Sequence, residues 1–336
     1  MMRAENTAVS GPNRRGLLAA APSLLLAPTW AAARAVTPYE RPNTKGVAGY
    51  SESAMVGFVG ARQNLAASLR ICHFPPLGLS WLWCNVLTPH GFYGYAHHLG
   101  SCGSQPVFAE PVRGAFSTRA DGAQAELIRT GADTSVTGVD FSAAIDFQPQ
   151  TRIALGPGAS PGRLSGHFKP THLHRGKVDT GRREQVGVID AVFEAGGRRY
   201  VMRGPGKYHE QTQVTPRFVT PFTYLAFWGA RDSGVAIQSP GGGSGALLIA
   251  GTQRLVTNLA STPPAVRRRY RIDLEGANSL EGELTAMARF SFPIFGDTWR
   301  GSFLRGAVGS EAVVGQLNDW RSDQNRYLPP VDPAKR

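Results

Sequence analysis

A tyrosine, a histidine and a glutamate stand side by side at Tyr208, His209 and Glu210, shortly after a Gly-Pro-Gly segment at 204–206. A histidine exchanges protons near neutral pH, and a glutamate does so when burial raises its pKa. Such groups could protonate an alkene carbon, place a water molecule or remove a neighbouring proton, which is the chemistry of hydration, isomerisation or cyclisation. We therefore take these three residues as the first catalytic candidates.

The spacing of these three residues leaves their role open. In a β-strand, Tyr208 and Glu210 would face one side of the sheet and His209 the other. They would share a cavity only if the strand twists or ends there, which the preceding Gly204-Pro205-Gly206 makes possible. In the structural alternative, His209 satisfies backbone groups at a seam between two halves of the protein.

Glu311 follows Gly309 and Ser310 and is the second acidic candidate. It either lines the same cavity as a catalytic carboxylate or serves as a turn residue.

Histidines raise the question of a metal site. His172 and His174 would project from one face of a strand, which suits a pair of metal ligands. A third and a fourth ligand are not evident in the sequence, and exposed histidines near a loop are the alternative. We predict no metal and no cofactor. The chain also lacks the G-x-S-x-G, Rossmann and P-loop motifs, which argues against a serine α/β-hydrolase, a nicotinamide enzyme and an NTPase.

Aromatic residues form the expected substrate-binding set. They gather in the first third and again after residue 221, and the set is Trp81, Trp83, Tyr95, Phe222 and Trp228. Large aromatic side chains either fill a core or form the apolar wall of a ligand cavity, and both interpretations stay open.

The elements that must position these residues are short strands. Apolar residues alternate with polar or small ones in many segments, for example at 139–145, and Gly196-Gly197 separates two such segments as a hairpin turn would. Short strands with turn residues between them predict a mainly β protein, a sandwich or barrel. Thr215-Pro216 and Thr220-Pro221 interrupt the pattern, so we expect β domains at 36–215 and 216–320, followed by a polar C-terminal tail at 321–336.

Residues 1–35 have the order of a signal peptide. Arg14-Arg15 precedes an apolar run at 17–30, and Ala33-Arg34-Ala35 then offers a cleavage site. The arginine pair favours a twin-arginine signal, with an ordinary secretory signal as the alternative. We expect the twin-arginine export machinery as a partner and a periplasmic or secreted protein. In an oxidising compartment, Cys84 and Cys102 are the preferred disulfide pair.

The net charge of +12 comes from scattered basic residues. Without a stacking-aromatic nucleic-acid motif, this charge predicts no nucleic-acid partner, but it could favour peripheral contact with an anionic membrane surface.

Several segments resemble the carotenoid 1,2-hydratase (hydroxyneurosporene synthase) and AttH-like superfamily. That group shows a strand, a Gly-x-Gly and then a histidine at a seam, and here Tyr200-Val201-Met202, Gly204-Pro205-Gly206 and His209 follow in that order. Residues 224–229 resemble the aromatic strand that follows the seam, and 305–311 the closing pattern of glycine then glutamate. The chain departs from the family after His209, where Glu210-Gln211-Thr212 replaces an acidic residue or asparagine followed by Trp-Gly.

The resemblance implies two lipocalin-like antiparallel β-barrels packed side by side around an apolar cavity. It also implies a lyase or isomerase, hydratase-like and independent of cofactors, that acts on a hydrophobic, isoprenoid-like small molecule. The alternative is a carrier that binds such a molecule without transforming it. An enzyme should bring titratable groups together in the cavity, whereas a carrier should not.

Overall fold

The computed structural model describes residues 50–320, apart from 61, 78, 98–114, 121, 133–134, 148–159, 175–180, 215–216, 219 and 295–296. All the described residues belong to one unit of the chain, which spans 36–336. The expected signal peptide at 1–35, the expected tail at 321–336 and Cys102 lie outside the described residues. Within the described part, no helix is long and apolar enough to cross a membrane.

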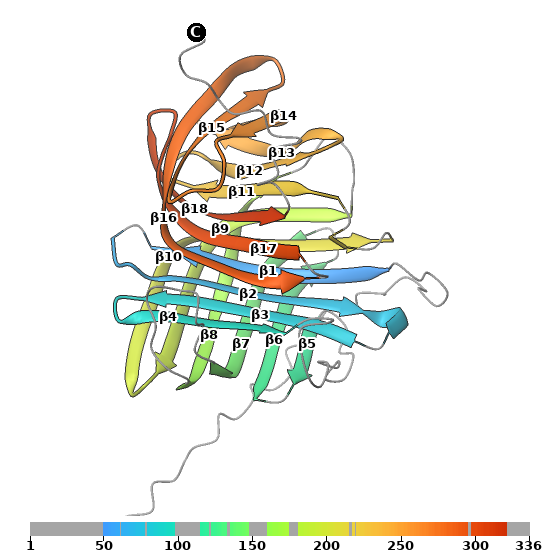
Figure 1. Cartoon of the computed structure of the whole chain (residues 1–336), viewed down its shortest axis with the longest axis vertical. Coiled ribbons are helices and arrows are strands. Elements are labelled where there is room, and N and C mark those ends of the chain that lie inside the picture. Colours follow the sequence, from blue (N-terminus) through green and yellow to red (C-terminus); the bar gives the residue numbers. More distant parts are fainter. Residues whose placement is uncertain are drawn as a thin grey trace, which may run out of the picture. The chain divides into compact units, whose positions relative to one another are not determined.

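The first part of the fold is a ten-stranded antiparallel sheet (Figure 1). Its strands, with one 3-10 turn η1 (Pro75–Leu77), are β1 (Ser51–Val59), β2 (Ala66–Phe74), β3 (Leu79–Thr88), β4 (Gly91–His97), β5 (Ala115–Ala120), β6 (Ala123–Ala132), β7 (Ser135–Phe147), β8 (Ser160–His174), β9 (Arg182–Ala195) and β10 (Arg198–Gln213). The strand order is β4-β3-β2-β1-β10-β9-β8-β7-β6-β5. The pairing of β1 with β10 therefore joins segments that are far apart in the sequence.

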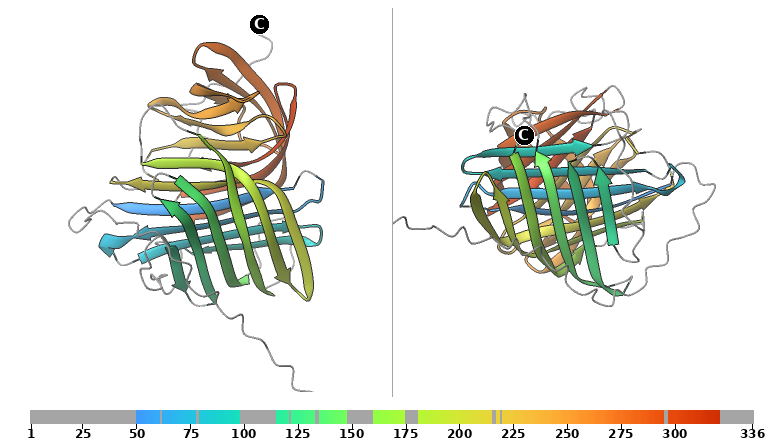
Figure 2. Two further views of the ribbon diagram at one scale, coloured as in Figure 1. Left: turned by 180° about the vertical axis from the view of Figure 1, so that it is seen from behind. Right: turned by 90° about the horizontal axis from the view of Figure 1, so that it is seen from below.

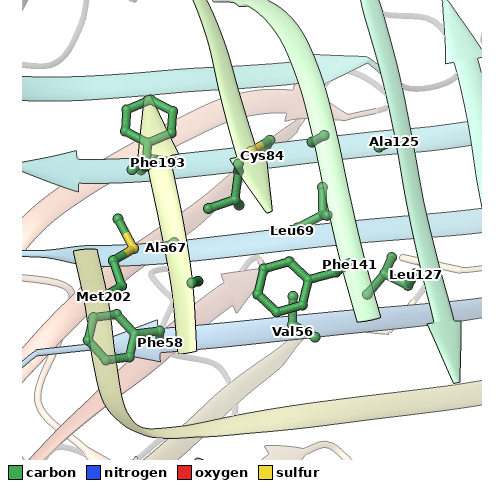
Figure 3. Packing of buried hydrophobic residues seen from close by; sticks show 14 of the residues in the cluster. Val56, Phe58, Ala67, Leu69, Cys84, Ala125, Leu127, Phe141, Phe193 and Met202 are labelled. Atoms are coloured by element: carbon green, nitrogen blue, oxygen red, sulfur yellow. The ribbon is translucent and has the colours of Figure 1, made fainter. Parts of the chain in front are cut away.

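This sheet folds back on itself, so that β5–β8 run across β2–β4 (Figure 2). Strands from the two ends of the sheet touch, because β5 contacts β2 and β7 contacts β4. The enclosed side chains form the sheet core, drawn in part in Figure 3, where Val56, Leu69, Phe141 and Met202 point into one shared space. Strands of period two supply this core from one face and leave the other face for a different partner.

The second part of the fold is a closed antiparallel barrel of eight strands. These are β11 (Phe222–Trp228), β12 (Ser233–Ser239), β13 (Gly242–Ile249), β14 (Thr252–Ser261), β15 (Arg267–Leu274), β16 (Ala277–Ile294), β17 (Asp297–Val308) and β18 (Glu311–Trp320). Alternate residues of β11 enter different cores. Leu225 and Phe227 join the barrel core, whereas Tyr224 and Trp228 join an interface core shared with the sheet.

The interface core holds the sheet against the barrel. Trp83 of the sheet lies with its ring centroid 5.0 Å from that of Trp299 and 4.7 Å from that of Phe292. Aromatic pairs at such distances bury large apolar areas and add favourable ring–ring contact. The buried interface sets the geometry of any site formed between the two parts.

The prediction of a mainly β, lipocalin-like fold is confirmed, and the structure refines it. The second half closes into a barrel, whereas the first is a curled sheet with edges at β4 and β5. The predicted hairpin turn is also present between β9 and β10, where Gly196 and Gly197 have φ of 57° and 71°. Two consecutive residues with positive φ are typical of a tight hairpin turn and favour glycine.

The structure corrects the expectation that Cys84 forms a disulfide. Cys84 is a free cysteine, buried in the sheet core, so it does not form the expected pair with Cys102. Cys84 sits on the face of β3 that packs inward against apolar side chains, where burial raises the pKa of its thiol.

Candidate functional site

A cavity of about 760 Å³ lies between the outer face of the sheet and the strands β11–β14 of the barrel. Its wall has a charged side and an apolar side. The charged and titratable side consists of Arg70, His174, Arg182, Glu184, Lys207, His209 and Arg217, and the apolar side includes Phe218, Pro221, Phe222, Val235 and Ile237. A concave site with apolar walls and a few convergent polar groups is the usual form of a small-molecule site.

The register of the sheet brings the titratable groups together. His209 on β10 pairs directly with Glu184 on β9, and Glu184 pairs in turn with His174 on β8. On the other side, His209 pairs with Met55 of β1, which pairs with Arg70 of β2. Directly opposed residues of adjacent antiparallel strands share a face, so this row presents all its side chains to the cavity.

His209 and Glu184 form a buried hydrogen-bonded pair. The distance from His209 Nδ1 to Glu184 Oε1 is 2.8 Å, and the two residues are 5% and 6% exposed. Tyr224 donates its hydroxyl to Glu184 Oε2 at 2.9 Å, and Lys207 Nζ donates to the Tyr224 hydroxyl. A carboxylate is only an acceptor, so Nδ1 must carry the proton, which leaves the lone pair on Nε2 of His209.

Burial and neighbouring charges set the protonation states of this pair. Burial alone would raise the pKa of the Glu184 carboxyl, but contact with His209 and the charge of Lys207 outweigh it and bring the pKa to about 2. Burial lowers the pKa of His209 to about 3, against the opposing effect of Glu184. At neutral pH Glu184 is therefore ionised and His209 is a neutral base.

Lys207 is the third buried group of this cluster. Burial lowers its pKa to about 8, partly opposed by Glu184, and its Nζ lies 4.3 Å from the ring centroid of Tyr224. Lys207 thus remains mostly protonated at neutral pH but is close enough to its pKa to release a proton.

We expect His209 to stay neutral between pH 8 and pH 5. Because folding lowers its pKa from 6.5 to about 3, the unfolded chain binds the extra proton first, and this contribution to stability is lost as the pH falls from about 6.5 towards 3. Long-range ¹⁵N–¹H NMR spectra, with His209 assigned by its absence in His209→Asn, should show a protonated Nδ1 and an unprotonated Nε2 throughout. A transition near pH 6.5 in the folded protein would contradict this expectation.

The structure places Tyr208 and Glu210 on the opposite face of β10 from the cavity. Tyr208 is part of the sheet core and donates its hydroxyl to Glu210. Glu210 also accepts hydrogen bonds from Arg129 at 3.0 Å and Arg183 at 2.9 Å. The strand stays regular through this segment, so the alternation that separates His209 from its two neighbours holds.

Glu311 lies away from the cavity, at the start of β18, and its carboxylate contacts the turn between β11 and β12. Its Oε1 accepts the backbone N–H of Arg231 at 2.6 Å, and its Oε2 accepts from the guanidinium of the same residue at 3.0 Å. The backbone hydrogen bond from Arg231 lowers the pKa of Glu311, although its burial acts the other way. These contacts match the turn role that the sequence left open.

The aromatic candidates divide between the cavity and the cores. Phe222 lines the cavity. Trp81, Trp83 and Trp228 are buried in the interface core, and Tyr95 packs against the sheet core. Three of the five thus help to hold sheet and barrel together.

Glu184 and Lys207 are site residues that no sequence pattern had singled out. A signal for Glu184 existed, because the Gly196-Gly197 turn fixes the register of β9 and β10. Counting outward from Ala195 and Arg198 in equal steps leads to Glu184 opposite His209, with no bulge on the way. Tyr224 and Arg70 offered no such signal, since they reach the cavity from the barrel and from β2.

The two histidines considered for a metal lie close together. The ring centroids of His172 and His174 are 4.8 Å apart, and burial, with a smaller effect of His172, lowers the pKa of His174 to about 4. Among the described residues, no group of three or more His, Cys, Asp or Glu side chains could hold a metal ion.

No known protein family and no curated protein matches this sequence. Solved structures do show similarity. CghA with Sch210972 has 10% identity over 84% of this chain and 94% of its own, with a TM-score of 0.47. A candidate AttH from Nitrosomonas europaea has 13% identity over 84% and 97%, also with a TM-score of 0.47.

Kievitone hydratase from Nectria haematococca has 10% identity over 85% of this chain and 94% of its own, with a TM-score of 0.44. The AttH name is that of the superfamily which the sequence resembles. At these identities and TM-scores, no conclusion about activity follows from the similarity.

Proposed function

We propose that this protein is a hydratase-like lyase or isomerase that acts on a hydrophobic small molecule bound between the sheet and the barrel. The observation that carries the proposal is the buried His209–Glu184 pair on the wall of a 760 Å³ cavity. A neutral histidine held by a carboxylate is a general base whose proton-accepting atom is oriented in advance. The aromatic and aliphatic side of the cavity supplies the surface for the hydrophobic substrate.

The residues in the cavity account for both proton transfers of a hydration. Nε2 of His209 takes a proton from water while the water oxygen bonds to one carbon of the alkene. The electrons of the broken π bond pass to the second carbon, which takes a proton either from the imidazolium of His209 or from Lys207. In the second case the imidazolium then returns its proton to Lys207. In an isomerisation, His209 would remove a proton from one carbon and return it to another. Glu184 stabilises the imidazolium in both reactions because its charge lies 2.8 Å from Nδ1.

The alternative of a non-enzymatic carrier predicts an apolar cavity without convergent titratable groups. The arrangement of His209, Glu184, Lys207 and Tyr224 supports the enzyme instead, because buried ionisable groups cost free energy unless they are paired or used. An isoprenoid-like substrate fits the apolar side of the cavity, which includes Phe222 and Ile237.

Turnover in isotopically labelled water tests the proposal. The full chain is incubated with alkene-bearing hydrophobic molecules, including isoprenoid acids and isoprenoid alcohols, in water enriched in ¹⁸O and deuterium. Mass spectrometry should detect ¹⁸O in a hydrated product or deuterium in an isomerised one. His209→Asn should lower the rate about 10²-fold or more. Molecules that bind and emerge chemically unchanged and unlabelled would support the carrier, and full turnover by His209→Asn would refute the assignment of His209.

Export and cellular location are separate proposals based on the leader at 1–35, which lies outside the described residues. We propose a twin-arginine route to the periplasm or the exterior, where the basic surface would favour contact with anionic lipid. The division of the chain near residue 216 into two domains is likewise a proposal.

A further inference from the structure

The charges that line the cavity are unbalanced. Four cationic side chains, Arg70, Arg182, Lys207 and Arg217, face one carboxylate, Glu184. Glu184 already accepts hydrogen bonds from His209 and Tyr224 and lies 3.5 Å from Arg182. A single carboxylate in this position compensates the nearest cations and leaves the others uncompensated.

Arg70 is the first cation without an acidic partner. In the described part of the chain it forms no ion pair, its one hydrogen bond is a long one of 3.4 Å to Ser53, and its buried Nε has no partner. Burial, together with repulsion from Arg217 and Arg182, lowers its pKa to about 10. The guanidinium therefore keeps donors available beside the cavity.

Arg217 is the second cation without an acidic partner. It is 6% exposed and donates to neutral groups, to Ser51 Oγ at 2.7 Å and to the backbone oxygen of Gln211 at 3.2 Å. Cys72 and, to a smaller extent, Glu52 favour its charged form, but the Glu52 carboxylate is engaged by His73 at 3.3 Å. Burial lowers the pKa of Arg217, so here too the protein holds a cation at a cost in free energy.

We propose that the cavity binds an amphipathic anion whose acidic group is held by Arg70 and Arg217 and whose apolar body lies against Phe218 and Phe222. Guanidinium groups match planar oxyacid groups such as a carboxylate, and a bound anion would relieve the repulsion among the arginines. The apolar side of the cavity argues for a hydrocarbon body on that acid. This inference deepens the proposed function and rests on it for the claim that the anion is a substrate.

A matched pair of dyes tests the binding claim without knowledge of the substrate. 8-Anilinonaphthalene-1-sulfonate carries an acidic group that N-phenyl-1-naphthylamine lacks, while their ring systems are the same. Fluorescence and calorimetric titrations of the full chain should show that the sulfonate dye binds at least about ten-fold more tightly than the neutral dye. Arg70→Gln and Arg217→Gln should each weaken the sulfonate about ten-fold and leave the neutral dye unchanged.

Arg203→Gln is the matched control, because Arg203 also lies on the sheet, on β10, but is 74% exposed and pairs with Asp190. It should bind both dyes as the wild type does. Arg70→Lys keeps a cation and should lose less affinity than Arg70→Gln. If Arg217→Gln does not fold, this comparison of the two Arg70 variants still separates the effect of charge from an effect on folding. Equal affinity for the two dyes, or an unchanged affinity for the sulfonate in Arg70→Gln, would overturn the proposal. Displacement of the dye by equimolar inorganic sulfate would also overturn it.

A failure of the anion-binding proposal can be distinguished from a failure of the proposed enzymatic function. His209→Asn should bind the sulfonate dye as the wild type does, because the histidine does not hold the acidic group. Arginine-dependent binding without any turnover would leave an anion carrier, and turnover of neutral alkenes alone would leave an enzyme with a neutral substrate.

Discussion

Glu184→Gln is expected to lower turnover about 10³- to 10⁴-fold. The glutamine keeps the shape of the side chain and can still accept the Tyr224 hydroxyl. It no longer carries the charge that stabilises a protonated His209, and its NH₂ group can donate to Nδ1. A histidine that accepts at Nδ1 carries its proton on Nε2, which is then no base. The labelled-water assay measures the loss directly.

The matched control for this variant is Glu194→Gln, on the same strand. Glu194 is 54% exposed and pairs with Arg199 at the surface, so its replacement should leave turnover unchanged. Glu184→Gln should also be less stable, because folding favours the ionised carboxylate among buried cations. Activity is therefore compared below the thermal midpoint of both variants. Equal rates for the wild type and Glu184→Gln would show that His209 acts without Glu184.

Asp319→Ala is expected to reduce the free energy of unfolding by about 3–5 kcal/mol. Asp319 and Arg268 are both 3% exposed, and Arg268 Nη1 lies 2.6 Å from Asp319 Oδ2. Thr223 donates to the other carboxylate oxygen at 2.8 Å. Removing the carboxylate leaves the guanidinium of Arg268 on β15 buried without its counter-charge on β18, the strand that closes the barrel by pairing with β11.

Urea unfolding measures this loss, and Asp190→Ala is the control. Asp190 also pairs with an arginine, but the two side chains are 60% and 74% exposed, so the change should be less than about 1 kcal/mol. Replacing Arg268 together with Asp319 by apolar residues should recover part of the stability, since no charge then stays buried alone. A loss below about 1 kcal/mol in Asp319→Ala would mean that water reaches Arg268.

The candidate site was in part readable from the hairpin of β9 and β10. His209 drew attention because of its residue type, and the Gly196-Gly197 turn located the two strands. Their uninterrupted register then implies Glu184 as its partner. The rule that separates odd and even residues of a strand also assigned Tyr208 and Glu210 to the other face. Local geometry was sufficient for these relations because a tight turn fixes the pairing on both sides of it.

By itself, the sequence determined the mainly β class, the strand–turn pattern and which residues share a face of each strand, because the two-residue period of a strand is a local property. Only the tertiary structure decided that the first half stays an open, curled sheet and that Trp83 and Trp228 pack at the interface while Phe222 lines the cavity. The tertiary structure also placed Arg70 and Tyr224 on the wall of the same cavity as His209. These outcomes depend on the pairing of β1 with β10 and on the burial of one sheet face against the barrel, both of which join residues that are distant in sequence.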